Sequence, residues 1–352
     1  MKVVVIGGGP VGLYTAIALE KNGYLVDVYE KGSWPIDKAC GQGIMPSGVD
    51  LLKDIGLSFK EGENYFPFKG ISYFDSDQMI RADLPRCGYG VERNTLSKML
   101  FDLANKKRNI NLFANSPVVD SFISENKFVL SINGELKKYE FAFACDGINS
   151  SLRMKYHNQK SKKKNLRMGA REHFWMKPWS HNVEVYWKDG IEAYVTPVSD
   201  KKIEIAFLWY DSFDFKGANL REKLWEKFPE LAEKVDIKSS ARDFRGSMPF
   251  VAHSSKIKVK NIFFVGDAFC FIDGITGEGI SLGIKSSKII TSRFIKWSCR
   301  DNLEVKFLYF HYTIMVNIAL FLARWKRLRT FVFNFLQRNP SIFRFILKIN
   351  DL

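Results

Sequence analysis

The sequence of 352 residues predicts an α/β fold: a parallel sheet built from discontinuous pieces, an inserted antiparallel β-sheet and a C-terminal helical segment. Two short apolar runs, at residues 3–6 and 262–265, are typical of buried parallel strands. Between them, three segments within residues 183–209 alternate apolar and polar side chains, as antiparallel strands with one buried face do. Helical periodicity returns after residue 277, so the parallel pieces enclose the antiparallel one.

The first thirty residues combine a strand, a glycine-rich turn, a helix and a second strand. Gly7, Gly9 and Gly12 form the pattern G-x-G-x-x-G directly after the first strand. Gly7 permits the sharp turn, Gly9 lets a pyrophosphate approach the backbone, and Gly12 permits close helix packing. The helix N-terminus offers free N–H groups to phosphates. Glu30 ends the second strand, where a carboxylate accepts hydrogen bonds from a ribose, so this region predicts dinucleotide binding.

A second motif follows the apolar run at residues 141–145. Asp146, Gly147, Ser150 and Arg153 match the pattern D-G-x-x-S-x-x-R. The motif places a carboxylate and a turn glycine at the carboxyl end of a strand, where open α/β sheets hold their ligands.

A third motif follows residues 262–265. Gly266 and Asp267 come directly after this strand, and Gly277 and Gly279 open a helix expected over residues 277–297. Glycines at a helix start let a flat ring approach the backbone, and the N-terminus carries about half a positive charge. Such a site stabilises the negative charge that a flavin acquires on reduction.

The three motifs in this order, over residues 3 to about 290, resemble those of FAD-dependent enzymes with the p-hydroxybenzoate hydroxylase fold. The resemblance implies a Rossmann-like FAD-binding domain in which Asp267 binds the ribitol chain and Glu30 binds the adenosine ribose. It also implies that Arg93 lies near the FAD pyrophosphate. Asp146 is expected near the same pyrophosphate, where it helps to dock NAD(P)H.

Two segments are similar to geranylgeranyl reductase-like flavoproteins. Residues 277–280 are similar to the G-E-G-I of that group, and residues 40–46 resemble its C-G-x-G-(L/I) segment, in which the cysteine lies near the flavin. A thiol there can donate a proton or contact the substrate, so Cys40 is the candidate catalytic residue; the alternative is a small residue in a tight loop. Phe269 and Cys270 depart from the usual motif and leave the substrate open.

We expect three parts in the chain. Residues 1–65, 89–165 and 246–297 form the FAD-binding domain, residues 66–88 and 166–245 form a β-rich substrate domain, and residues 298–352 form the C-terminal helical segment. His173, on an aromatic strand of the substrate domain, is expected to be structural rather than an acid or base.

The composition limits the partners. The net charge of +15 favours phosphates or lipid headgroups, or else a solvated basic face, and no motif supports nucleic-acid binding. Five cysteines without a C-x-x-C pair indicate reduced thiols, and the five histidines show no metal-ligand spacing, so we expect no metal. No signal-peptide pattern precedes the first strand, so we expect a cytoplasmic protein.

The C-terminal segment leaves three interpretations open. Residues 307–323 are almost entirely apolar but fall short of a bilayer span of about 20 residues, and a basic cluster follows them. The segment forms a helical layer packed on the FAD domain or a second subunit, or it makes peripheral contact with the inner face of the membrane through residues 305–350, or it spans the membrane.

These observations favour a FAD-dependent oxidoreductase acting on a hydrophobic small molecule. The motifs shared with geranylgeranyl reductases favour hydride transfer from reduced flavin to a C=C bond. The alternative is an NAD(P)H-dependent FAD monooxygenase that hydroxylates an aromatic or polyketide-like substrate, and a second alternative is a non-catalytic membrane-associated flavoprotein. Because the chain has one dinucleotide fingerprint, NAD(P)H is expected to be a transient reductant.

Overall fold

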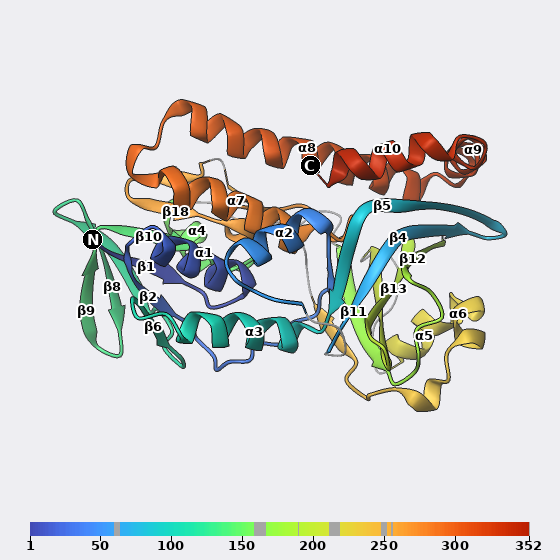
Figure 1. The fold of residues 1–352 in the computed structure, drawn as a ribbon, viewed down its shortest axis with the longest axis horizontal. Coiled ribbons are helices and arrows are strands. Elements are labelled where there is room, and N and C mark those ends of the chain that lie inside the picture. Colours follow the sequence, from blue (N-terminus) through green and yellow to red (C-terminus); the bar gives the residue numbers. More distant parts are fainter. Residues whose placement is uncertain are drawn as a thin grey trace.

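The computed structural model describes residues 1–59, 64–157, 167–188, 190–210, 219–247, 252–254 and 256–351. A six-stranded and an eight-stranded sheet lie side by side, and the C-terminal helices run along one edge of both (Figure 1). The α/β class and the enclosed second sheet agree with the prediction.

The six-stranded sheet has the order β17-β18-β10-β1-β2-β6. Its strands are β1 (Lys2–Ile6), β2 (Leu25–Tyr29), β6 (Ile110–Phe113), β10 (Phe141–Ala144), β17 (Lys258–Val259) and β18 (Ile262–Phe264). All neighbouring strands are parallel except β17 and β18. The central β1 is buried on both faces, which explains its unbroken run of valines. Helices α1 (Pro10–Lys21), α3 (Arg93–Asn105) and α7 (Gly279–Arg293) cover this sheet (Figure 1).

The eight-stranded sheet has the order β15-β11-β14-β13-β12-β4-β5-β3. Its strands are β3 (Gly43–Ile44), β4 (Tyr65–Asp75), β5 (Gln78–Val91), β11 (Arg167–Phe174), β12 (Asn182–Lys188), β13 (Ile191–Ser199), β14 (Lys202–Tyr210) and β15 (Arg245–Ser247). The expected meander is present as β12, β13 and β14. The β4–β12 pair is parallel, which was not predicted. β4 and β12 belong to separate parts of the chain, so no hairpin fixes the direction of that pair.

Smaller elements complete the fold. They are the three-stranded sheet of β7 (Asp120–Ser124), β8 (Lys127–Ile132) and β9 (Glu135–Tyr139), the pair β16 (Ala252–His253) and β19 (Cys270–Phe271), and helices α2 (Pro46–Asp54), α4 (Ser151–His157), α5 (Leu220–Glu226) and α6 (Pro229–Lys234). Glu92 is the N-cap of α3, directly before the helix begins at Arg93. Much of the lysine-rich stretch after α4 lies outside the described residues.

Three helices form the C-terminal segment, namely α8 (Cys299–Arg324), α9 (Lys326–Arg338) and α10 (Pro340–Asn350). Trp325 separates α8 from α9, and Pro340 begins α10. Within the described residues, α8 alone has the length and composition to cross a membrane, and 22% of its most apolar stretch is buried in the protein.

Candidate functional site

The two helices that begin next to motif glycines, α1 and α7, lie close together. Helix α1 follows Gly9, and α7 begins at Gly279. The two helices pack against each other, and Thr15 Oγ1 of α1 lies 2.7 Å from Ser287 Oγ of α7. Because β1 and β18 are parallel to β10, both helices start at the same edge of the six-stranded sheet.

The glycines of the first motif have different surroundings. Gly7 has a φ of +101°, and a Cβ there would lie 2.4 Å from the carbonyl oxygen of Cys145. A Cβ at Gly12 would lie 1.9 Å from the oxygen of Gly7, so both positions exclude side chains through packing. At Gly9, by contrast, the nearest atom is Nη2 of Arg93 at 3.8 Å. Gly9 therefore faces open space next to a cation.

Glu30 is fixed at the end of β2 by the backbone. Its carboxylate accepts hydrogen bonds from the amides of Gly8 (2.7 Å) and Gly32 (3.0 Å). The indole of Trp34 donates to the Gly8 carbonyl at 2.9 Å and covers this turn. The assignment of Glu30 to the adenosine ribose stays a prediction.

Charged side chains from four separate segments, Lys38, Arg93, Arg153 and Asp267, lie close enough to shift one another's pKa or that of a shared neighbour. Burial raises the pKa of Asp267 to about 6, although Arg93, Lys38 and Arg153 oppose this shift. Burial and the neighbouring Arg93 lower the pKa of Lys38. These pKa shifts arise because the groups share one poorly solvated region. No sequence motif pointed to Lys38, which belongs to the loop after β2.

Two polar atoms in this region are buried without a hydrogen-bond partner in the described part of the chain: Nε of Arg93 and Oδ1 of Asp146. Burial also raises the pKa of Asp146. Buried polar atoms without a partner among the described residues are unusual and are suited to bonding with a bound molecule. Together with the open backbone at Gly9, these atoms fit a bound diphosphate and its attached hydroxyl groups. The site therefore fits FAD.

Arg153 connects the second motif to the third by hydrogen bonds. Its guanidinium donates to the carbonyl oxygens of Asp267 at 3.1 Å and Ala268 at 3.0 Å, and also to that of Ile148. The amide of Arg153 donates to Ser150 Oγ at 2.9 Å. The two later motifs thus form one structural unit, in which Gly266 (φ +61°) turns the chain after β18.

A second charged cluster lies where the loop after β2 meets the eight-stranded sheet. Arg171 of β11 binds both carboxylate oxygens of Asp37, at 2.9 and 2.8 Å. His173 lies 2.6 Å from Asp243 through Nδ1 and 2.8 Å from Oε1 of Gln42 through Nε2. His173 is buried, and both of its ring nitrogens have a hydrogen-bond partner. Sequence reasoning missed Asp37, Gln42 and Asp243, because tertiary folding alone brings them to β11.

Glu204 of β14 occupies the centre of this cluster. Its side chain is fully buried, and burial raises its pKa well above the usual range. The nearest nitrogen atoms of basic side chains are His173 Nε2 at 3.6 Å and Arg171 Nε at 4.0 Å. Neither carboxyl oxygen makes a hydrogen bond within the described residues. A buried carboxyl with unused hydrogen-bonding capacity is suited to proton exchange with a bound molecule.

Cys40 lies between the two charged regions. Burial raises the pKa of its thiol; Arg93 opposes this shift and Glu204 adds to it. Burial also raises the pKa of Cys145 and of Cys270 to about 12. Cys40 is therefore a neutral thiol near pH 7, which suits a proton donor better than a nucleophile. Its catalytic role stays a prediction.

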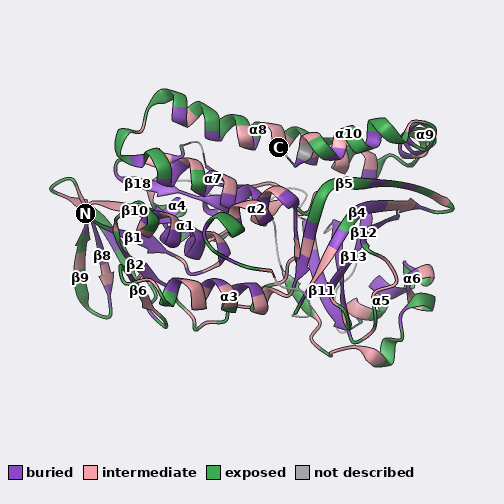
Figure 2. Cartoon of the chain, viewed as in Figure 1, coloured by how far each residue is buried: buried purple, intermediate pink, exposed green. Residues whose placement is uncertain are grey.

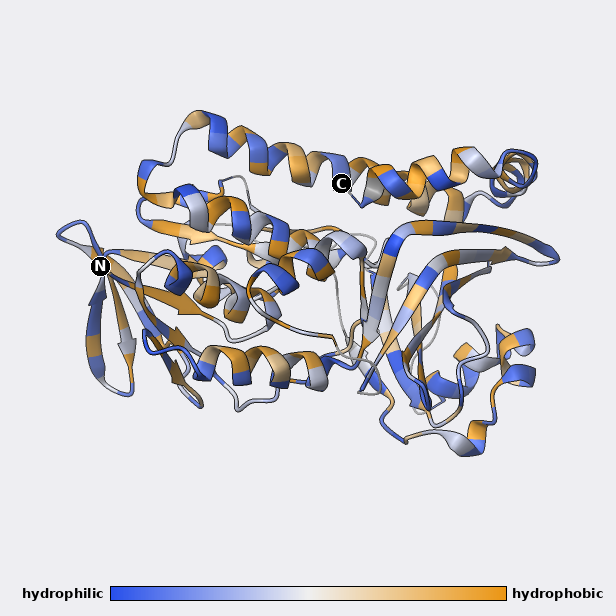
Figure 3. Cartoon of the chain, viewed as in Figure 1, coloured by the Kyte–Doolittle hydropathy of each residue, from blue (hydrophilic) through white to orange (hydrophobic). Residues whose placement is uncertain are grey.

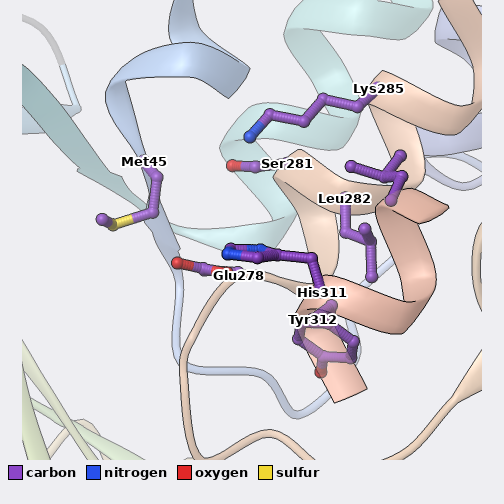
Figure 4. A pocket seen from close by; sticks show the side chains of 8 residues that line it. Met45, Glu278, Ser281, Leu282, Lys285, His311 and Tyr312 are labelled. Carbon is purple, nitrogen blue, oxygen red and sulfur yellow. The ribbon is translucent and has the colours of Figure 1, made fainter. Parts of the chain in front are cut away.

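The start of α7 holds a further ionisable group. Burial raises the pKa of Glu278 to about 8; Lys285 opposes the shift and Asp351 adds to it. Glu278 and Lys285 line a small cavity of about 20 Å³ between α2, α7 and α8, which His311 also lines (Figure 4). Lys285 donates to the backbone carbonyl oxygen of Asp351 at 3.2 Å, and the amide of Ser47 donates to the side-chain carboxylate of Asp351 at 2.9 Å. The C-terminal end of the chain thus returns to the tip of α7, which the sequence did not indicate.

Gly277 and Gly279 leave this tip open. Gly277 has a φ of +69°, and apart from its chain neighbours no atom of the described residues lies within 4 Å of a Cβ built on it. At Gly279 the nearest atom is a ring carbon of Phe271, at 4.0 Å. The backbone is therefore open at this tip, and the contact of Gly277 and Gly279 with a flavin ring stays a prediction.

Comparison with known proteins agrees with this geometry. Residues 1–296 match the FAD binding domain family. Kynurenine 3-monooxygenase of Anopheles gambiae is 22% identical over 84% of this chain and 67% of its own. The 3-demethoxyubiquinol 3-hydroxylase of Escherichia coli K12 is 21% identical over 81% of this chain and 77% of its own.

Solved structures share the fold. A probable FAD-dependent monooxygenase from Pseudomonas aeruginosa superposes with a TM-score of 0.74, at 14% identity over 92% of this chain and 94% of its own. A halogenase in complex with phloroglucinol and FAD superposes with a TM-score of 0.74, at 15% identity over 86% of this chain and 72% of its own.

The fold and the site define a FAD-dependent oxidoreductase of the p-hydroxybenzoate hydroxylase type. The chain belongs to the FAD binding domain family. Its relatives include monooxygenases, and these comparisons do not show the similarity to geranylgeranyl reductases that two short segments suggested.

Proposed function

We propose that this protein is an NAD(P)H-dependent FAD monooxygenase that hydroxylates a hydrophobic aromatic or polyketide-like small molecule. The observation that carries the proposal is the similarity of over 80% of the chain to two hydroxylating enzymes. Hydride transfer to a C=C bond, our first interpretation, rests on residues 277–280 and Cys40 alone and is less well supported.

The residues around Gly9 would hold the cofactor. Arg93 and Lys38 supply positive charge for the pyrophosphate, and Asp267 and Glu30 supply hydrogen-bond acceptors for the ribitol and ribose hydroxyls. FAD, once reduced by NAD(P)H, supplies the activation of dioxygen. The start of α7 places partial positive charge at the open backbone of Gly277 and Gly279.

The residues around Glu204 would transfer protons to and from the bound molecule. A buried carboxyl whose pKa is raised holds its proton more tightly, and in the protonated form it can donate a hydrogen bond to a bound molecule and exchange its proton with a neighbour. His173 lies next to Glu204 and is bonded to Asp243, which is only partly buried. This arrangement offers a path for a proton between solvent and the interior, with His173 as the intermediate acceptor.

NAD(P)H would bind only transiently, because the chain has a single dinucleotide fingerprint. Among the described groups, Asp146 is the candidate for contact with this reductant. A cytoplasmic location gives access to NAD(P)H and suits the free cysteines of the chain.

Measurement of NADPH oxidation and oxygen consumption together, on purified protein with a panel of aromatic and polyketide-like compounds, tests the proposal. We expect one oxygen consumed per NADPH and a hydroxylated product. Substrate reduction under anaerobic conditions would instead support hydride transfer to a double bond. A flavoprotein that turns over none of the panel with either reduced nicotinamide would favour a non-catalytic role.

A further inference from the structure

We propose that the outer face of helices α8, α9 and α10 docks on an anionic lipid bilayer, with the helices lying parallel to its surface. The proposal concerns where the protein works. It stands on the exposure and charge of these helices and does not depend on the reaction proposed above.

The inner faces of these helices are fixed to the rest of the molecule. On α8, Tyr309 donates to the carbonyl oxygen of Gly266 at 3.2 Å, and Tyr312 donates to that of Asp273. On α9, the buried Arg329 donates to both carboxylate oxygens of Asp75 in β4, at 2.7 and 2.9 Å. These bonds determine which side of each helix faces outward.

The outward side is apolar. Of twenty-two large hydrophobic side chains exposed among the described residues, eleven lie between residues 307 and 345. We call these eleven the outer stripe: Phe307, Phe310, Ile314, Ile318, Phe321, Trp325, Leu328, Phe331, Phe335, Ile342 and Phe345. On α8 its members recur every three or four residues, which places them on one side of the helix. Exposed and hydrophobic residues both occur along this edge of the molecule (Figures 2 and 3).

Soluble monomers rarely expose contiguous apolar surface on this scale without a partner. Six members of the outer stripe are Phe, and one is Trp. Aromatic side chains such as these are suited to the boundary between headgroups and acyl chains.

The charge of the segment identifies the partner. Residues 305–350 contain no Asp or Glu. Seven of their basic side chains are exposed: Lys306, Arg324, Lys326, Arg327, Arg338, Arg344 and Lys348. A second copy of this chain would present the same positive charge and repel it, whereas an anionic bilayer attracts it. The combination of apolar stripe and cationic flanks therefore favours anionic lipid.

The anchoring also determines the orientation. Tyr309 and Tyr312 hold α8 on the segment that follows β18, so crossing a bilayer would require these buried contacts to break. A helix held along its length and apolar on its outer side lies in the interface plane.

Flotation of the purified full-length holoprotein with vesicles tests the proposal. We would compare vesicles of phosphatidylcholine alone with vesicles that also contain phosphatidylglycerol. We expect flotation with the anionic vesicles, weakened by added salt. Charge reversal in K326E/R327E should weaken binding by about tenfold or more, and F310E/F321E should abolish it.

V119E/L136E is the matched control, because Val119 and Leu136 are 77% and 63% exposed at a distant edge of the fold. This control should float like the wild type, and all variants should retain their flavin. Absence of flotation, equal binding to both vesicle types, or unchanged binding by the two test variants would overturn the proposal. A dimer that F310E/F321E dissociates, without binding of the wild type to vesicles, would assign the outer stripe to a second copy and also overturn it. Turnover plays no part in the readout, so this test and that of the proposed function fail separately.

Discussion

Gly283 of α7 packs directly on Val11 of α1: a Cβ added at Gly283 would lie 2.5 Å from Cγ2 of Val11. This contact brings together the two helix starts that are expected to hold opposite ends of FAD. The contact leaves no room for a side chain, so the spacing of the helices depends on a single glycine.

Gly283→Val should push the two helix starts apart. Overpacking costs about 1–3 kcal/mol of folding stability, and we expect FAD affinity to fall by at least about tenfold as the groove widens. Fluorescence titration of the apoprotein with FAD measures the affinity. Ser292→Val, on the exposed side of the same helix, should bind FAD like the wild type. Equal FAD affinity of the two variants would contradict the role of this contact.

Asp267 should make the stability of the apoprotein depend on pH. Its pKa is raised by burial to about 6, above its ordinary value of 3.8, so the folded state binds a proton more tightly than the unfolded state. The contribution of Asp267 to stability therefore falls as pH rises from about 4 to about 6. We expect Asp267→Asn to remove this part of the slope when urea unfolding is measured across that range. Parallel curves for wild type and variant would show that the carboxyl of Asp267 titrates normally.

Glu204→Gln should separate catalysis from folding. Because burial raises the pKa of Glu204 well above its usual range and neither carboxyl oxygen makes a hydrogen bond within the described residues, an amide of the same shape should change the unfolding free energy by less than about 1 kcal/mol. If Glu204 exchanges protons, kcat should fall by about a hundredfold, and the pH dependence of kcat should flatten. An unchanged pH profile would assign Glu204 a structural role only.

Glu192 is a second buried carboxyl, against which the stability effect of Glu204→Gln can be compared. It is equally buried on the neighbouring strand β13, but it forms a salt bridge with Arg167. Glu192→Gln should therefore destabilise the fold by about 3 kcal/mol, because a buried cation loses part of its compensation. Similar stability losses for Glu192→Gln and Glu204→Gln would contradict the distinction between the two carboxyls.

Arg329→Ala should loosen α9 and α10 from the eight-stranded sheet. The substitution leaves Asp75 buried without its cation, which costs about 3–5 kcal/mol. Limited proteolysis should then cleave the C-terminal segment faster than in the wild type. Arg327→Ala removes an exposed arginine two residues away, and its C-terminal segment should be cleaved by the protease no faster than that of the wild type. Unchanged proteolysis of Arg329→Ala would show that apolar packing alone holds these helices.

Local chemistry explains what could be predicted from the sequence. Gly7, Gly9 and Gly12 lie within a few residues of each other, so their spacing alone predicts the turn and the start of the helix. The same holds for the meander, whose alternation follows from one buried face. The position of Glu30 is likewise set by the strand that it ends.

Tertiary contacts explain what was missed. Lys38 and Glu204 come from segments without a motif, and they meet the site only through the packing of the two sheets. Asp351 reaches α2 and α7 only because α8, α9 and α10 run the length of the molecule and return. Residue spacing does not encode such long-range placement.

Turnover in the presence of isotopically labelled dioxygen tests the central claim most directly. The account predicts that one labelled oxygen atom enters the organic product and that NADPH is oxidised in step with product formation. An unlabelled product with a reduced double bond, formed equally well without oxygen, would contradict the monooxygenase assignment.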